Sequence, residues 1–154
     1  KKVDYKTTGI GEEAKRLERL KTWWKNKKRK KNCIMITLET KKRKLEYAIG
    51  IDLGGTFIKS AIVDSKGKII KHYKTETYSE ISPKKVLSQI EKCIDFLKKD
   101  FKKEIVGIGI GAPGIVTNGV MKYPPNFKGW KEVNLARHFA RKYKTESIAD
   151  NDAN

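Results

Sequence analysis

Five small and polar residues in the first half of the chain have the types and spacing of a phosphate site. Asp52, Gly54, Gly55 and Thr56 lie in the run DLGGT, and Lys59 follows three residues later. Adjacent glycines let a backbone turn with positive φ and bring its amides close to a phosphate. Asp52 at a strand end can hold a hydrated Mg²⁺, and Thr56 adds a hydroxyl donor. The same residues also fit a plain tight hairpin, with Lys59 as a solvated strand lysine.

A second group of polar residues lies at the end of the sequence, in the run DNDAN (150–154). A carboxylate can accept the proton of a hydroxyl group that attacks a phosphoryl group, which makes Asp152 a candidate general base. Asn151 and Asn154 flank it with neutral donors that would orient it without neutralising its charge. Alternatively, Asp150 and Asp152 cap a helix that begins just beyond them.

A glycine-rich run between these two groups marks the end of a buried strand. Residues 105–110 are almost wholly apolar, which is typical of a strand buried on both faces, and residues 107–114 read GIGIGAPG. Ligands usually bind where the buried strands of such sheets end. We therefore expect this strand in the centre of a sheet, with a glycine-rich loop at its carboxyl end.

The elements that must position these residues can be read from the apolar pattern. Segments 45–53, 57–64 and 68–78 are separated by turn residues and predict a three-stranded antiparallel meander. Ser82 followed by Pro83 predicts a helix start, because serine can cap a helix and proline fits its first turn.

The apolar stripe of this helix continues through residue 99. A hairpin at 115–123, a helix at 135–143 and a strand at 146–149 complete the pattern. Strands that alternate with helices predict an α/β fold with a mixed sheet, an antiparallel three-stranded start and flanking helices.

The charge of the chain is distributed unevenly. The 154 residues carry a net charge of +18, and residues 1–46 hold seventeen basic and six acidic side chains. This segment is expected to be a basic leader with one short helix at 10–25, and otherwise flexible. Cys33 and Cys93 form no disulfide or metal pattern, and no apolar run approaches the ~18 residues of a membrane span. A cytoplasmic protein without a membrane partner is expected.

DLGGT looks like the first phosphate motif of the sugar kinase, Hsp70 and actin superfamily. Three later motifs resemble segments of the ROK (repressor, open reading frame, kinase) family of sugar kinases: G-x-P-G at 111–114, P-N-x-x-G-W at 125–130 and DNDAN at the end. They occur in the order and spacing of the family and cover about 70% of the chain, from Tyr47 to Asn154. The resemblance implies the N-terminal lobe of an actin-like ATPase (ribonuclease H-like) fold at 47–154, without the C-terminal lobe.

The resemblance also implies roles for individual residues. Gly114, Asn126 and Asn151 would contact the sugar, and Asp152 would be the base. Asp52, Gly54, Gly55, Thr56 and Lys59 would contact the phosphates of ATP, with Asp52 holding Mg²⁺ through water. Asp150 departs from the glutamate more usual in the family. Trp130 is expected to be a packing residue rather than a sugar contact.

ATP-dependent phosphorylation of a hexose, as by a glucokinase, is the activity that the resemblance implies. The C-terminal lobe would supply the adenosine pocket and a structural zinc, so 1–154 alone is expected to be inactive, and the full-length protein could be a homodimer. The alternative is a sugar-sensing ROK transcriptional regulator in which residues 1–46 bind DNA. We expect a hexose and a nucleotide as partners rather than a nucleic acid. Residues 1–46 show the pattern of one helix, and no recognition helix of a DNA-binding motif can be identified in them. Another interpretation of this segment is that Met35 is the true translation start.

Overall fold

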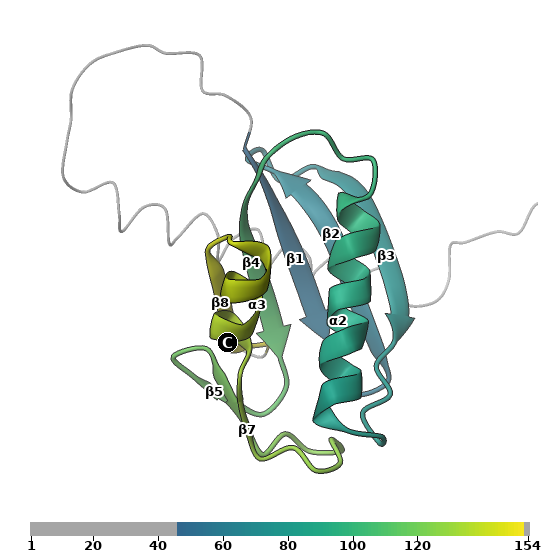
Figure 1. Cartoon of the computed structure of the whole chain (residues 1–154), viewed down its shortest axis with the longest axis vertical. Coiled ribbons are helices and arrows are strands. Elements are labelled where there is room, and N and C mark those ends of the chain that lie inside the picture. Colours follow the sequence, from purple (N-terminus) through teal and green to yellow (C-terminus); the bar gives the residue numbers. More distant parts are fainter. Residues whose placement is uncertain (1–45, 153–154) are drawn as a thin grey trace, which may run out of the picture. The chain divides into compact units, whose positions relative to one another are not determined.

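Residues 46–152 are the part of the chain that the structure, a computed structural model, describes. They form a mixed sheet, two helices on one of its faces, and a smaller second sheet (Figure 1). The expected helix at 10–25, the expected flexibility of the basic leader, and Asn154 lie outside the described residues.

The main sheet has five strands in the order β3-β2-β1-β4-β8. Antiparallel pairing joins β1 to β2 and β2 to β3, so the predicted meander is confirmed. Parallel pairing joins β1 to β4 and β4 to β8. The strand predicted for the sheet centre is β4, which is flanked on both sides but lies next to the middle strand, β1. The strand bounds are β1 Tyr47–Leu53, β2 Phe57–Asp64, β3 Ile69–Glu76, β4 Ile105–Ala112 and β8 Ser147–Asn151.

The two faces of β1 and β4 differ because side chains alternate along a strand. Isoleucines of the two strands pair in register and lie in the core, Ile49 opposite Ile108 and Ile51 opposite Ile110. On the other face Gly50 lies opposite Gly109, so this part of the sheet carries almost no side-chain bulk. The buried isoleucines fix which face of the sheet the helices cover.

Helix α2 (Pro83–Lys98) begins as predicted. The Ser82 hydroxyl accepts a hydrogen bond from the backbone amide of Lys85 at 3.2 Å, and Pro83 occupies the first turn. The helix contacts β2 and β3 (Figure 1). Its inner face is fully buried, which places this helix firmly on the sheet; the apolar residues of that face are Val86, Ile90, Cys93, Ile94 and Leu97.

Helix α3 (Leu135–Tyr143) has the predicted bounds and packs on β4 and β8. The Asn134 side chain caps it by accepting a hydrogen bond from the amide of Arg137 at 2.8 Å. Leu135 and Phe139 are fully buried. Both helices cover the same face of the sheet (Figure 1).

The smaller sheet consists of β5 (Ile115–Thr117), β6 (Val120–Lys122) and β7 (Glu132–Asn134). The predicted hairpin is β5–β6, and its turn residues Asn118 and Gly119 have φ of 51° and 79°, as a two-residue hairpin turn requires. Strand β7 was not predicted, because three residues are too few to show a pattern. The last strand also runs further than predicted, through Asn151 rather than Ala149.

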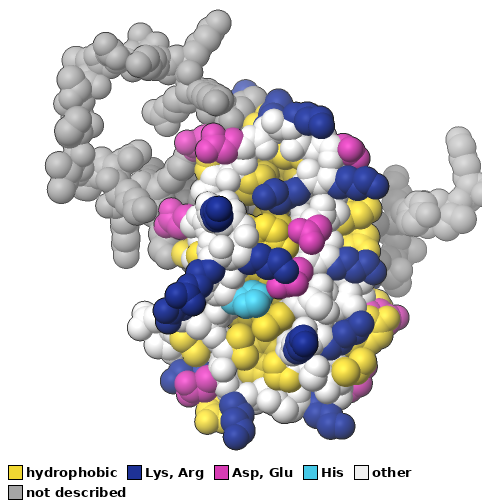
Figure 2. Space-filling model, in the orientation of Figure 1, with side chains coloured by type: hydrophobic (Ala, Val, Ile, Leu, Met, Phe, Trp, Pro, Cys, Tyr) yellow, Lys and Arg dark blue, Asp and Glu magenta, His cyan; other side chains and the backbone are white. Residues whose placement is uncertain are grey.

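A polar cluster joins α2 to α3 on the outer face. The Glu91 carboxylate lies 3.0 Å from His138 Nε2 and 2.6 Å from Lys142 Nζ. The Tyr143 hydroxyl donates a hydrogen bond to the Asp95 carboxylate at 2.9 Å. Basic side chains are scattered across this face, with acidic ones interspersed among them (Figure 2). Burial raises the pKa of Glu91, but hydrogen bonds from Lys142 and His138 outweigh it and hold this pKa below its ordinary value of 4.5.

The core packing of α2 predicts a large loss of stability on truncation. Leu97→Ala removes a fully buried side chain, so the free energy of unfolding should fall by about 2–5 kcal/mol in urea denaturation. Lys84→Ala, at an exposed position of the same helix, is the control and should change it by less than about 0.5 kcal/mol. Equal effects of the two substitutions would contradict the packing of α2.

The Glu91 cluster predicts a pH-dependent contribution to stability. A lowered pKa means that ionised Glu91 stabilises the fold above pH 4.5 and that this contribution is lost as the pH falls through the lowered value. Wild type should therefore be more stable than Glu91→Gln near pH 6.5, and the difference should shrink below pH 4.5. Thermal melts across this range measure it. Glu104→Gln, at an exposed loop position, should show no such trend, and a pH-independent difference for Glu91→Gln would contradict the assignment.

Candidate active site

The candidate site lies at the edge of the sheet where three parallel strands end. Asp52 of β1 is in register with Gly111 of β4, and Gly111 with Asp150 of β8. Strands lie about 4.8 Å apart, so the backbones of Asp52 and Asp150 are separated by roughly 10 Å. Gly111 places no side chain between them. The two groups of polar residues predicted from sequence, about 100 positions apart in the chain, are therefore brought together.

Asp52 is buried, with 8% of its surface exposed. Its cross-strand partner in the β1–β2 pair is Lys59, which is half-buried. Directly opposite residues on one face of an antiparallel pair lie close enough to interact, so a carboxylate and an ammonium group share this part of the sheet. Lys59 is therefore half-buried opposite Asp52 rather than fully solvated.

The turn at Gly54 and Gly55 differs from the prediction in its backbone. Neither glycine has positive φ, so that part of the expectation was wrong. Position 54 needs glycine for a steric reason instead, because a Cβ there would lie 2.9 Å from the carbonyl oxygen of Phe57. A Cβ on Gly55 would meet no heavy atom within 4 Å among the described residues. Gly55 and Thr56 are exposed, so the tip of this turn is open to a ligand.

Two hydroxyl groups from another part of the chain hold this turn. Thr77 Oγ1 donates to the carbonyl of Gly54 and Ser79 Oγ donates to the carbonyl of Gly55, both at 2.7 Å. The Thr77 amide also donates to the carbonyl of Thr56 at 2.9 Å. Thr77 and Ser79 are buried. Sequence reasoning missed both, since hydroxyl residues after a strand usually bond locally, and here the partners lie more than twenty positions away.

The loop after β4 is tied to the end of β8. Gly114 has φ of 79°, and a Cβ there would lie 3.0 Å from the Cα of Pro124. Its carbonyl accepts a hydrogen bond from the side-chain amide of Asn151. Gly114 and Asn151, both predicted to contact a sugar, are thus in direct contact with each other.

The loop that carries Asn126 is anchored by its aromatic neighbours. Phe127 and Trp130 are buried and pack edge to face at 5.6 Å, and the Trp130 indole donates to the carbonyl of Met121 at 3.2 Å. Trp130 is therefore a packing residue, as predicted. Asn126 is exposed and has φ of 65°. The amide of Lys128 donates to the carbonyl of Ser79 at 2.9 Å, which links this loop to the segment that holds the glycine turn.

Asp152 lies one residue beyond β8 and is half-buried. Its backbone amide donates to the carbonyl of Ala112 at 3.1 Å, so it continues the pairing of β8 with β4. Asp150 lies within β8, and its carboxylate accepts a hydrogen bond from the amide of Asn151 at 2.8 Å. Asp150 is thus a strand residue, and the helix that it was expected to cap lies outside the described residues.

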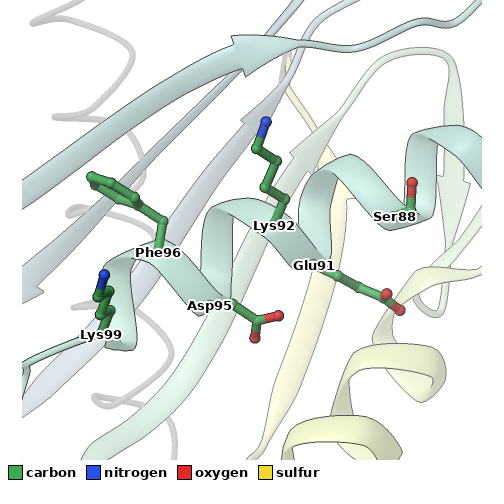
Figure 3. A pocket seen from close by; sticks show the side chains of 6 residues that line it. All are labelled: Ser88, Glu91, Lys92, Asp95, Phe96 and Lys99. Atoms are coloured by element: carbon green, nitrogen blue, oxygen red, sulfur yellow. The ribbon is translucent and has the colours of Figure 1, made fainter.

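Other features of the described residues lie apart from this edge. A hollow of about 550 Å³ lies on the outer face of α2. Its side chains come from α2 and from Lys99, the residue after it, and they point to different sides, as Figure 3 shows, so they do not converge on a ligand; they are Ser88, Glu91, Lys92, Asp95, Phe96 and Lys99. Burial raises the pKa of the Cys93 thiol to about 11, which makes it unreactive.

Residues 46–152 contain no group of three or more His, Cys, Asp and Glu side chains that could hold a metal ion. Within the same residues no helix is long and apolar enough to cross a membrane.

Comparison with known proteins gives the family and the fold. Residues 48–154 match the sequence model of the ROK family. The glucokinase of Thermotoga maritima is 34% identical over 108 residues, which cover 69% of this chain and 33% of that protein. The xylose repressor of Caldicellulosiruptor bescii is 32% identical over 118 residues, which cover 69% of this chain and 28% of the repressor.

A solved structure gives the same result. The ROK family glucokinase of Streptomyces griseus, in complex with glucose and AMPPNP, superposes with a TM-score of 0.63 at 25% identity over 70% of this chain and 34% of that one. The chain thus spans about a third of the length of these relatives. Its α/β domain has the five-stranded mixed sheet and small antiparallel sheet of the actin-like ROK kinases. By its sequence and by its fold, this chain belongs to the ROK family.

Proposed function

We propose that this chain is the sugar- and phosphate-binding lobe of an ATP-dependent hexose kinase of the glucokinase type. The observation that carries the proposal is the register of β1, β4 and β8, which brings Asp52 and the segment Asp150–Asp152 to one edge of the sheet. A phosphoryl transfer enzyme must hold its two substrates in line, and one edge with two anchored loops is suited to this task.

The phosphate side of the site would consist of the β1–β2 turn. Gly54, Gly55 and Thr56 would meet the phosphates of ATP, since the tip is exposed and a Cβ at Gly55 has open space around it. Lys59 lies opposite Asp52 and would add positive charge. Asp52 fits a hydrated Mg²⁺, because that ion favours carboxylate and phosphate oxygens and keeps several waters. Bound Mg²⁺ would neutralise part of the phosphate charge.

The sugar side would consist of the two loops beside the end of β8. Asn126 and Asn151 would bind sugar hydroxyls, and Gly114 would let the loop approach the ring. The oxygen of a sugar hydroxyl would form a bond to the γ-phosphorus while the bond between that phosphorus and the leaving ADP oxygen breaks. Asp152 would accept the proton that the hydroxyl loses.

The match of residues 48–154 to the ROK family supports a proposed division of the protein. Residues 47–154 would form the N-terminal lobe and 1–46 a basic leader, while a C-terminal lobe would supply the adenosine pocket and a structural zinc. The isolated chain would then not turn over substrate. A cytoplasmic location and a homodimer of the full-length protein belong to the same proposal.

A sugar-sensing regulator is the second candidate, and two observations favour it. The xylose repressor of Caldicellulosiruptor bescii is 32% identical over 118 residues, and residues 1–46 carry a net charge of +11. Asp152 argues for the kinase, since a sensor needs the sugar pocket but not a base. Salt-dependent binding to duplex DNA that is lost on deletion of 1–46 would favour the regulator.

A chimera allows the kinase proposal to be tested. Residues 47–154 of this chain replace the matching third of the Thermotoga maritima glucokinase, and ATP-dependent phosphorylation of glucose is followed in a coupled assay. The proposal predicts turnover. A folded chimera that binds glucose without phosphorylating it would count against the kinase and for the regulator.

Asp152→Asn in this chimera tests the base. It keeps the size of the side chain but removes the proton acceptor, so kcat should fall by about 10²–10⁴-fold, with a much smaller change in the KM for glucose. Asp150→Asn removes the same charge two residues away and should lower kcat by less than about tenfold. Similar losses from both substitutions would assign the effect to charge rather than to a base.

The pair Gly54→Ala and Gly55→Ala tests the phosphate turn. A Cβ at position 55 has open space, whereas one at position 54 meets a carbonyl at 2.9 Å. Gly55→Ala should therefore leave Tm nearly unchanged but raise the KM for ATP by roughly tenfold or more. A hydrogen bond to a charged group contributes about 1.5–3 kcal/mol, and loss of one such bond to a phosphate gives a change of this size. Gly54→Ala should lower Tm as well. An unchanged KM for ATP in Gly55→Ala would place the phosphates elsewhere.

A further inference from the structure

The segment Thr77–Ser79, which follows β3, contacts both loops of the candidate site. The Ser79 hydroxyl donates to the carbonyl of Gly55 at 2.7 Å, in the phosphate turn. The Ser79 carbonyl accepts from the amide of Lys128 at 2.9 Å, in the loop of Asn126. Ser79 is 6% exposed, so these bonds are formed away from competing water. A single residue therefore joins the two loops.

Thr77 differs from Ser79 in one respect that permits a matched comparison. Its hydroxyl and its amide bond to Gly54 and Thr56, both in the phosphate turn. Neither of these two bonds reaches the loop of Asn126. Loss of the Thr77 hydroxyl should therefore disturb one loop, whereas loss of the Ser79 hydroxyl should disturb both.

Backbone geometry explains how one short segment reaches both loops. Tyr78 has φ of 56°, a left-handed conformation that is uncommon for a bulky residue. The turn at Tyr78 is closed by the amide of Ile81, which donates to the Tyr78 carbonyl at 3.1 Å. Such conformations persist where the surroundings hold them in place. Hydrogen bonds of Thr77 and Ser79 on either side of Tyr78 provide this support.

We propose that Ser79 is a positioning residue that couples the phosphate turn to the sugar loop. The inference rests on the proposed function, in which Gly55 meets the phosphates and Asn126 the sugar. In-line transfer is sensitive to placement, and an error of about 1 Å can cost about 10²-fold in rate. Through its two bonds Ser79 sets the separation of the two substrates, although it touches neither.

Amide hydrogen exchange of the 154-residue chain tests this without any activity. In Ser79→Ala the amides of Gly54, bonded to Phe57, and of Lys128, bonded to Ser79, should both exchange about tenfold faster or more. In Thr77→Val only Gly54 should be affected. Ser88→Ala, which removes an exposed serine hydroxyl bonded within α2, is the control and should change neither amide.

The core amides separate positioning from a general loss of stability. Amides of Ile51 and Ile110 in the buried strands should keep their exchange rates in Ser79→Ala. Equal acceleration at these amides would show that Ser79 merely supports the fold, and would overturn the proposal. Unchanged exchange at Lys128 would overturn it too, because the two loops would then not be coupled.

The chimera adds a kinetic test. Ser79→Ala should lower kcat by about 10–10²-fold with smaller changes in both KM values, and Thr77→Val should mainly raise the KM for ATP. Ser79→Thr, which keeps a hydroxyl, should restore most of kcat. A normal kcat in Ser79→Ala would overturn the proposal. An inactive wild-type chimera would count against the kinase function instead, and amide exchange alone would then decide the role of Ser79.

Discussion

The parallel alignment of β1, β4 and β8 is the constraint on which the candidate site depends. Because parallel strands end at the same edge, Asp52 and Asp150 fall in one register row with Gly111 between them. The alignment is held by isoleucine pairs such as Ile51 and Ile110 on the core face, which α2 and α3 cover. A shift of one residue would move each side chain to the opposite face. Core packing on one face thus fixes the chemistry at the strand ends.

The loops at this edge are held by hydrogen bonds between distant segments rather than by their own turns. The glycine turn is held by Thr77 and Ser79, and the loop of Gly114 is bonded to Asn151. Thr77 and Ser79 are buried residues of the segment between β3 and α2, and Asn151 is the last residue of β8. The site is therefore prepared before a ligand arrives, which reduces the ordering that binding must provide.

The fold was largely predictable from sequence because its signals are local. The apolar runs of β1, β2 and β4 and the Ser82-Pro83 start of α2 each lie within a short window. The short strand β7 and the backbone of the glycine turn were not predictable, since the first shows no period and the second depends on the carbonyl of Phe57. Ser79 was missed for the same reason: its partners at 55 and 128 are set by topology.

We propose that one edge of the sheet binds both a sugar and phosphates. The most direct measurement is NMR titration of the ¹⁵N-labelled chain with glucose and with Mg·ATP. We predict that glucose shifts the amides of Gly114, Asn126 and Asn151, and that Mg·ATP shifts those of the Gly54–Thr56 turn, while Glu91 on the outer face of α2 does not respond. Shifts confined to α2, or none at the strand ends with either ligand, would contradict the claim.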